Sequence, residues 1–208
     1  MLVIENQPKP KTRVIPASLA YEEMNGEALP YKGYLDVLAG SKEIEEITGS
    51  SSLQAVLVAI ITGFLFSRLD RKKYLLATNE SGLHLSRGNN LANDIAIFEK
   101  EKIKLDDQYF NVAPKVVVEV DIKVDLSETS WTSEMAYTFA KSQKMLDFGV
   151  EKAIWISTHN RRIFVNTSDQ EWPGLDWHYA DFDQDILVLD DCVLNLARLL
   201  AEEGIEWA

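Results

Sequence analysis

Two short apolar segments each carry a carboxylate, and this combination strongly limits what the chain can fold into. Residues 115–124 are rich in valine and alternate between aliphatic and polar side chains from residue 118 onward, with Glu119 among the polar ones. Residues 93–98 read Asn-Asp-Ile-Ala-Ile-Phe and place Asp94 at the start of a second apolar run. Both patterns are typical of β-strands. A charge within such a strand costs free energy unless another group compensates it. The sequence therefore predicts a sheet that holds two carboxylates.

A shared cation is one way to compensate two converging carboxylates, because Mg²⁺ prefers oxygen ligands of this kind. The pair Asp94 and Glu119 thus favours a metal-dependent hydrolytic site. A structural interpretation also fits the same residues. An aspartate that opens a strand is often a turn residue, and Glu119, Asp121 and Lys123 together fit the solvated face of an antiparallel sheet. The pattern alone leaves both interpretations open.

Composition bounds the class of protein. The chain has 208 residues, of which 46% are hydrophobic, which suits one medium-sized domain with its own core. Lys and Arg number 21 against 33 Asp and Glu, so the net charge is −12. A surface of this sign repels nucleic acid on average, which argues against a protein that coats DNA. It leaves a DNA enzyme possible, since cations offset active-site acids.

Cysteine content and hydropathy exclude several other classes. Cys192 is the single cysteine, so the chain can form no internal disulfide and no zinc finger built on cysteine pairs. We expect Cys192 to be a small buried apolar residue. Residues 1–6 lack the pattern of a secretory signal, and the apolar stretch 55–66 is too short to span a membrane. These observations predict a cytoplasmic protein with no membrane segment.

The order of expected elements predicts the fold class. Residues 1–33 contain four prolines and are expected to form an irregular N-terminal arm, followed by a single domain over residues 34–208. Helices are expected at 34–47 with a break near Gly40, and at 53–69, 133–148 and 191–203. Strands are expected at 74–77, 82–85, 94–98, 115–124, 153–157, 163–166 and 186–189. Interleaved strands and helices indicate an α/β fold at the border with α+β, with a mixed central β-sheet flanked by helices.

Several of these segments, taken in order, resemble a known family. The resemblance rests on Asn-Asp-Ile-Ala-Ile at 93–97, Pro-Lys-Val-Val-Val-Glu-Val at 114–120 and Lys-Ala-Ile-Trp-Ile at 152–156. Between the last two lies a lysine-bearing helix that ends in Phe-Gly-Val at 148–150. In this order and spacing they are similar to the Uma-two family of restriction-endonuclease-like proteins, within the PD-(D/E)XK nuclease superfamily. The resemblance covers residues 34–166 and implies a restriction-endonuclease-like fold.

The resemblance also implies roles for particular residues. Asp94 matches the first metal-binding aspartate and Glu119 the second acidic ligand, with the main-chain carbonyl of Val120 as a third. These groups would hold Mg²⁺ or Mn²⁺. Lys141 matches a lysine that stands eight residues before the glycine of the Gly-Val pair. It would orient the attacking water or stabilise the charge that develops on the phosphate.

The chain departs from the resembled pattern at two positions. Asn93 replaces the proline that usually precedes the aspartate, and Asp121 stands where many superfamily members carry lysine. Asp121 could bind a second ion or hold a neighbouring lysine. Lys123 and Lys144 therefore remain alternatives to Lys141. A further acid from the first helix, Glu45 or Glu46, is an accessory candidate.

Three functions compete at this stage. The first is a Mg²⁺-dependent DNA endonuclease, active as a homodimer because double-strand cutting by this fold usually needs two sites. The second is a catalytically inactive protein of the same fold that binds nucleic acid or a protein partner. The third, ranked last, is a hydrolase of a small acidic molecule, whose substrate the negative surface would also hinder. The proline-containing arm and the apolar helix at 53–66 are the candidate dimer contacts.

Overall fold

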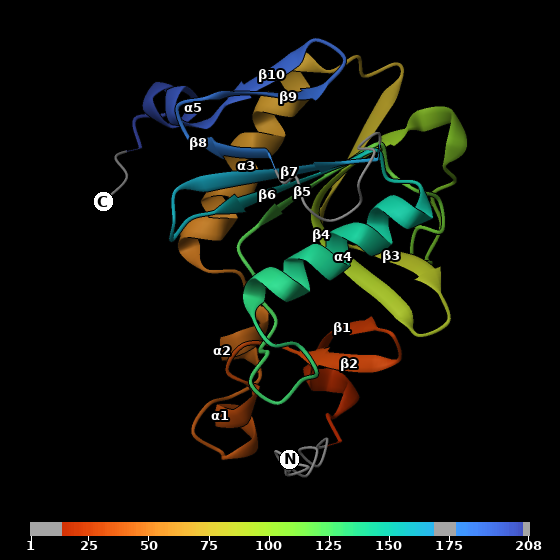
Figure 1. Cartoon of the computed structure of the whole chain (residues 1–208), viewed down its shortest axis with the longest axis vertical. Coiled ribbons are helices and arrows are strands. Elements are labelled where there is room, and N and C mark those ends of the chain that lie inside the picture. The colour runs from red at the N-terminus through yellow and green to blue at the C-terminus, as the bar shows by residue number, and fades with distance from the viewer. Residues whose placement is uncertain (1–13, 169–177, 206–208) are drawn as a thin grey trace, which may run out of the picture.

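The computed structural model describes residues 14–168 and 178–205, and within them a large sheet lies between two helical layers (Figure 1). The strands of this sheet run in the order β2-β1-β4-β5-β6-β7-β8, and β3 also pairs with β4. Their bounds are β1 (Ala20–Met24), β2 (Glu27–Pro30), β3 (Tyr74–Ser86), β4 (Asn89–Glu99), β5 (Val116–Val120), β6 (Lys152–Ser157), β7 (Arg162–Thr167) and β8 (His178–Asp181). A separate hairpin joins β9 (Asp185–Leu189) to β10 (Cys192–Asn195).

The sheet is mixed, as the sequence predicted. Strands β5 and β6 pair in parallel, whereas the other strand pairs are antiparallel. The parallel pair is connected by α4 (Glu134–Phe148), which covers one face of the sheet (Figure 1). The opposite face is covered by α3 (Ser52–Arg68), the β9–β10 hairpin and α5 (Leu196–Glu202).

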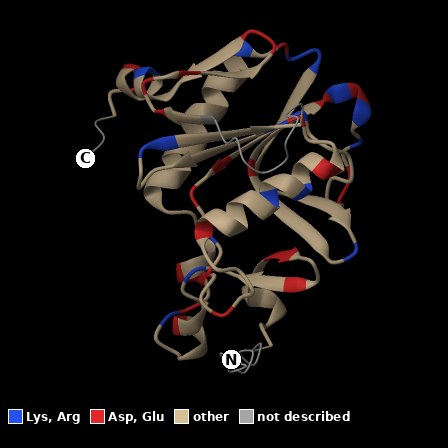
Figure 2. Cartoon of the chain, viewed as in Figure 1, with Lys and Arg blue, Asp and Glu red and all other residues tan. Residues whose placement is uncertain are grey.

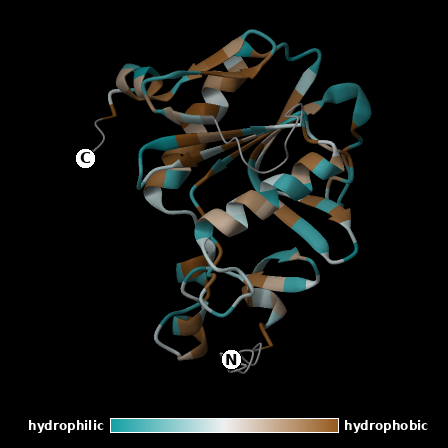
Figure 3. Ribbon diagram, in the orientation of Figure 1, coloured by the Kyte–Doolittle hydropathy of each residue, from teal (hydrophilic) through white to brown (hydrophobic). Residues whose placement is uncertain are grey.

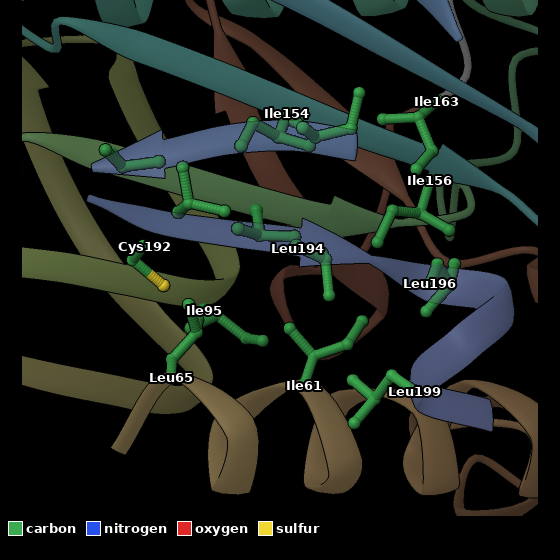
Figure 4. Close-up of a cluster of buried hydrophobic side chains, with 14 of the residues drawn as sticks. Ile61, Leu65, Ile95, Ile154, Ile156, Ile163, Cys192, Leu194, Leu196 and Leu199 are labelled. Carbon is green, nitrogen blue, oxygen red and sulfur yellow. The ribbon is translucent and has the colours of Figure 1, made fainter. Parts of the chain in front are cut away.

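The main hydrophobic core lies between the sheet and α3. Leu57, Ile61 and Leu65 form the inner face of α3 and pack with residues of β4, β5, β6, β10 and α5 (Figure 4). Hydrophobic residues are concentrated in the central strands (Figure 3). Every residue of β5 is buried, so the alternative interpretation that placed Glu119 on a solvated face is wrong. The reason is its central position, which covers it on both faces.

Local capping explains where the two long helices begin and end. The hydroxyl of Ser51 accepts the backbone N–H of Gln54, and that of Ser133 accepts the backbone N–H of Ala136, which satisfies donors at each helix N-terminus. Gly149 ends α4 with a φ of 115°, a conformation that side chains with a Cβ rarely adopt. These boundaries agree with the helices predicted at 53–69 and 133–148.

Three predicted segments differ from the structure. Residues 20–30, expected to be irregular, form the β1–β2 hairpin, in which Asn25 and Gly26 have the positive φ that a tight turn needs. The first part of the helix expected at 191–203 is strand β10, because residues 192–195 pair with β9. The helix expected at 34–47 is two short helices, α1 (Tyr34–Leu38) and α2 (Glu45–Thr48), separated near Gly40 as predicted.

Two strands are also longer or shorter than expected. The two strands predicted at 74–77 and 82–85 are one strand, β3, with a register shift where Asn79 and Glu80 have positive φ. Strand β5 ends at Val120 rather than at residue 124, because Asp121 has a φ of 58°. Residues 1–13 of the predicted arm lie outside the described residues. Cys192 is buried, as expected. No helix of the described chain has the length and apolar character to cross a membrane.

Candidate active site

The site is centred where β4 and β5 separate. Their ladder pairs Ile97 with Val116 and ends at Ile95 opposite Val118, so one more step would set Asp94 opposite Glu119. Beyond that point the Asp94 side chain enters the space between the strands, and its Oδ2 accepts the backbone N–H of Val120 at 2.8 Å. The end of the ladder therefore places the Asp94 carboxylate against the backbone of Val120, the residue that follows Glu119.

Lys141 of α4 joins this pair. Its Nζ lies 3.2 Å from Oε1 of Glu119 and 2.6 Å from Oε1 of Glu22, and it donates to the carbonyl of Ala92 at 2.8 Å. The three protons of the ammonium group thus have three acceptors. Glu119 also accepts from Nδ2 of Asn93 at 3.0 Å. Lys141 and Glu119 are thus in direct contact, whereas Asp94 contacts Gln54 and the Val120 N–H and interacts with Lys141 through charge alone.

Glu22 is part of the site, although its segment was expected to be irregular. It reaches Lys141 from β1, and its carboxylate also accepts the backbone N–H of Ala92 at 3.0 Å and the hydroxyl of Tyr137 at 2.6 Å. Strand β1 pairs with β4 through Glu23 and Asn90, which fixes Glu22 beside the lysine. The sequence signal was weak, since Tyr-Glu-Glu between prolines resembles an ordinary polar segment.

The charged side chains of this cluster are almost fully buried. Their exposed fractions are 4% for Glu22 and Asp94, 2% for Glu119 and 1% for Lys141. Burial raises the pKa of Glu119 to about 8; the Lys141 ammonium opposes this shift, whereas Asp94 and Glu22 add to it. Burial also raises the pKa of Asp94 above its usual value, and the Val120 N–H opposes that shift. Three carboxylates thus face one buried ammonium group, an arrangement that favours an additional positive charge.

Lys141 itself stays protonated. Burial alone would lower the pKa of its ammonium group, but Glu119 and Glu22 outweigh this effect, and the pKa is raised above its usual value. Burial and the neighbouring Glu22 raise the pKa of the Tyr137 phenol, which therefore remains a hydrogen-bond donor. Lys141 Nζ also lies 5.4 Å from the centre of the Trp155 ring. The site thus supplies a permanently charged cation next to Glu119.

Gln54 is a second residue that the sequence analysis missed. Its Nε2 lies 3.2 Å from each carboxylate oxygen of Asp94 and 2.8 Å from the carbonyl oxygen of Val120. A signal was present, since Gln54 is the single amide in the apolar stretch 53–66. It also shares the buried face of α3 with Leu57 and Ile61. Beside Asp94 the structure thus places an amide from α3 and no acid from the first helix.

The other accessory candidates lie apart from this centre or at its edge. Glu46 is exposed on α2 and accepts the backbone N–H of Glu43, and Glu45 is exposed beside it. Asp121 turns away and accepts both the N–H and the hydroxyl of Thr158. Lys144 lies half-buried on α4, three residues after Lys141.

Lys123 lies at the edge of the site. It forms an ion pair with Glu80 and donates to Ser50 Oγ at 2.8 Å. Its charge lowers the pKa of Asp94, against the larger effect of burial. Ser50, Glu80 and Asp94 all line a surface pocket of about 300 Å³, whose other wall is α3. This pocket connects Asp94 to solvent, with the Lys123–Glu80 pair beside it.

The donor set suits a hard divalent cation. Asp94, Glu119 and the Val120 carbonyl offer oxygen atoms, which is what Mg²⁺ or Mn²⁺ takes from proteins. In the described ranges, 14–168 and 178–205, no three Asp, Glu, His or Cys side chains form a ready cage for a metal ion. The excess of buried negative charge is the observation that favours a cation here, and two carboxylates with a carbonyl are the groups that would hold it.

The fold itself defines a structural class. It is a mixed sheet with helices on both faces, whose central strands β4 and β5 separate at a cluster of buried acidic residues. A solved structure with this fold is titled a "putative nuclease belonging to DUF820", from Anabaena variabilis ATCC 29413. It superposes with a TM-score of 0.57 at 15% sequence identity, over 90% of this chain and 93% of that chain. No protein-family model matches the sequence, and no curated protein matches it. The likeness establishes the fold.

Proposed function

We propose that this protein is a metal-dependent endonuclease that hydrolyses phosphodiester bonds in DNA. The observation that carries the proposal is the buried cluster of Asp94, Glu119 and Lys141 at the separation of β4 and β5. Two carboxylates can hold the ion that assists phosphodiester hydrolysis, and a charged lysine can stabilise the phosphate. The solved structure with the same fold is titled a "putative nuclease", which supports the same proposal. The family we propose is Uma-two, of the PD-(D/E)XK superfamily.

The residues would divide the work by charge and position. Asp94, Glu119 and the Val120 carbonyl would hold Mg²⁺ or Mn²⁺, which would supply a Lewis acid and a bound water of lowered pKa. Lys141, 3.2 Å from Glu119, stabilises negative charge on the phosphate oxygens. Glu22 and the Ala92 carbonyl fix the position of the Lys141 ammonium group. Glu22 thus acts as a positioning residue.

The substrate would approach from the pocket that opens on Asp94. That pocket of about 300 Å³ is bordered by the Lys123–Glu80 ion pair and by Ser50. A phosphate group entering there would compete with Glu80 for Lys123. Because the net charge is −12, long-range electrostatic attraction does not assist DNA binding. We therefore expect binding to depend on cations in solution as well as on local lysines.

A specific observation also favours the second candidate function, a protein of this fold that binds a partner without cutting. Gln54 donates to the atoms that would hold the cation, and Lys141 already contacts Glu22, Glu119 and the Ala92 carbonyl within the protein. Both arrangements must change at least in part before catalysis. An inactive protein would keep the hydrogen bonds of Gln54 and Lys141 as they are, and it would not bind a metal ion at this site.

Cleavage of plasmid and linear DNA in Mg²⁺ and in Mn²⁺ tests the proposal. We expect metal-dependent cutting that falls by roughly 100-fold or more in Glu119→Gln and in Asp94→Asn, since each removes a charged metal ligand. The matched control is Asp147→Asn. It makes the same change from carboxylate to carboxamide at an exposed position of α4 and should leave cutting unchanged. Wild-type protein that leaves both DNA forms intact in both metals would reject the nuclease and support the binding protein.

We further propose that the protein forms a homodimer through the outer face of α3. Leu53, Val56 and Phe66 are 40%, 45% and 39% exposed on this face, and residues 51–67 contain no charged side chain. Gly63 of the same helix also faces open space, since a Cβ added there would have no atom within 4 Å. The sequence analysis named this apolar helix as a candidate dimer contact, and these three exposed residues are available for one.

Charge complementarity favours a second copy packed antiparallel. Exposed Glu45 and Glu46 of α2 precede the α3 N-terminus, and exposed Arg68 and Arg71 lie at its C-terminus. Figure 2 shows acidic residues near α1 and α2. In an antiparallel pair about 25 Å long, the acidic end of one α3 meets the basic end of the other. A two-fold axis across α3 would make both ends complementary at once.

A further inference from the structure

The amide of Gln54 is surrounded by hydrogen-bond acceptors. Both carboxylate oxygens of Asp94 and the carbonyl oxygen of Val120 lie within 3.2 Å of its Nε2. None of these three atoms can donate, so the NH₂ group of the amide must face them, whichever way the side chain is assigned. The partially positive NH₂ group therefore lies among the negative atoms at this point.

The atoms that accept from Gln54 are two of the three proposed metal-binding groups. A cation bound by Asp94 and the Val120 carbonyl would meet the NH₂ hydrogens, which repel it. Rotation of the amide by half a turn exchanges Nε2 and Oε1, and the last torsion of glutamine is broad and roughly two-fold. After this rotation, Oε1 would face the same position as a neutral oxygen ligand.

Withdrawal of the side chain is much harder than its rotation. Gln54 is 4% exposed, and it lies on the inner face of α3 with Leu57 and Ile61. Its backbone N–H is held by the Ser51 hydroxyl at 3.2 Å, which fixes the first turn of the helix. A change at the amide therefore occurs in place, without movement of α3.

We propose that Gln54 is an exchangeable occupant of the cation position. In the metal-free protein its NH₂ group cross-links Asp94 to Val120, and when a divalent cation binds, the amide rotates and presents Oε1 to it. Gln54 thus weakens metal affinity while it stabilises the metal-free fold. This inference rests on the proposed metal site but not on DNA cutting.

Gln54→Glu is the decisive variant, because it replaces the exchangeable donor with a carboxylate that can only accept. Two carboxylates would then face each other without a cation, so the metal-free protein should unfold at a lower temperature than wild type. With a cation the added charge should tighten binding by roughly tenfold or more. Gln143→Glu is the matched control, since it adds the same charge on α4, where Gln143 donates to Asp147.

The experiment is a calorimetric titration of the full-length protein with Mn²⁺, together with thermal unfolding in EDTA and in Mn²⁺. We expect Gln54→Glu to bind Mn²⁺ at least about tenfold more tightly than wild type and than Gln143→Glu, with a lower unfolding temperature in EDTA. Adding Asp94→Asn to Gln54→Glu should remove the gain in affinity. Equal Mn²⁺ affinity in wild type and Gln54→Glu, or no binding by either, would overturn the inference.

Parallel DNA-cutting assays separate this inference from the proposed function. If Gln54→Glu gains Mn²⁺ affinity but neither protein cuts DNA, the role of Gln54 stands and the nuclease proposal fails. If wild type cuts DNA with Mn²⁺ while Gln54→Glu shows no gain in affinity, the nuclease stands and Gln54 has another role.

Discussion

Glu119 is the residue at which burial, charge and metal binding meet. Lys141 favours the charged form of Glu119. Burial and the neighbouring carboxylates of Asp94 and Glu22 favour its protonated form. Its pKa of about 8 shows that the second group of effects outweighs the first. A bound cation would reverse this balance, because it favours the carboxylate.

The raised pKa of Glu119 predicts a pH dependence of stability in the absence of metal. In the unfolded chain this carboxyl has its usual pKa of 4.5, whereas in the folded protein it is about 8. The folded state therefore holds the proton more tightly, so this contribution to stability is complete below pH 4.5 and is lost as the pH rises through 8. In EDTA, the urea midpoint should fall over this range, and less so in Glu119→Gln. A midpoint with the same pH dependence in both proteins would contradict the assignment.

Lys141 offers a test of the buried ion pairs. Lys141→Met keeps the length of the side chain but leaves Glu22 and Glu119 without their cation, which should cost about 3–5 kcal/mol in the free energy of unfolding. Lys144→Met on the same helix should cost less than about 0.5 kcal/mol. Urea unfolding measures both. Adding Glu22→Gln to Lys141→Met should recover part of the lost free energy of unfolding. Equal losses in Lys141→Met and Lys144→Met would refute the ion pairs of Lys141.

At the scale of elements, α4 controls where Lys141 lies. The helix connects the parallel strands β5 and β6, begins at the Ser133 cap and ends at Gly149. Lys141 lies near the middle of α4, and the buried Tyr137 one turn before it contacts the same partner, Glu22. The spacing of four residues puts both side chains on one face of the helix. The start of α4 therefore affects the geometry of the charged cluster.

The Ser133 cap yields an element-scale prediction. Ser133→Ala removes the acceptor for the Ala136 N–H and should lower the free energy of unfolding by about 0.5–2 kcal/mol. Ser133→Asp preserves an acceptor at the same position and adds a favourable charge at the helix N-terminus, so it should retain wild-type stability. Chemical denaturation of the two variants measures this. Equal losses in both would show that the cap is not the relevant interaction.

The β1–β2 hairpin was the element that the sequence analysis predicted least well. Its residues looked irregular because the segment is short and flanked by prolines, and a hairpin of this size is marginal on its own. Pairing of Glu23 with Asn90 on β4 and burial of Met24 and Leu29 stabilise it in the folded protein. Glu22 could therefore not be assigned before the hairpin was placed on the sheet.

At the scale of the whole molecule, the uncharged outer face of α3 predicts the oligomeric state. A glutamate at the centre of this face, Val56→Glu, would place two like charges near the two-fold axis of an antiparallel dimer. We expect wild type to be dimeric at micromolar concentration and Val56→Glu to be at least tenfold more weakly associated, measured by analytical ultracentrifugation. Leu105→Glu, at an exposed site remote in sequence from α3, is the control. A monomeric wild-type protein would reject the proposed dimer.

The sequence by itself determined the elements whose signals are local. Periodic apolar residues together with Ser51, Ser133 and Gly149 predicted α3 and α4, and the aliphatic runs predicted β4 through β7. The carboxylates that the sequence singled out, Asp94 and Glu119, were recognisable because a charge within an apolar strand is costly wherever that strand lies. Strand β10 was missed, since residues 192–195 are compatible with helix until β9 pairs with them.

Only the tertiary structure decided which polar groups surround those carboxylates. Glu22 comes from a distant hairpin and Gln54 from α3. The lone amide in the apolar stretch 53–66 singles out Gln54, but it does not say which carboxylate that amide contacts. Their burial and hydrogen bonds depend on how the sheet separates between β4 and β5, which is a property of several strands at once. The two carboxylates follow from local sequence, whereas their hydrogen-bond partners follow from packing.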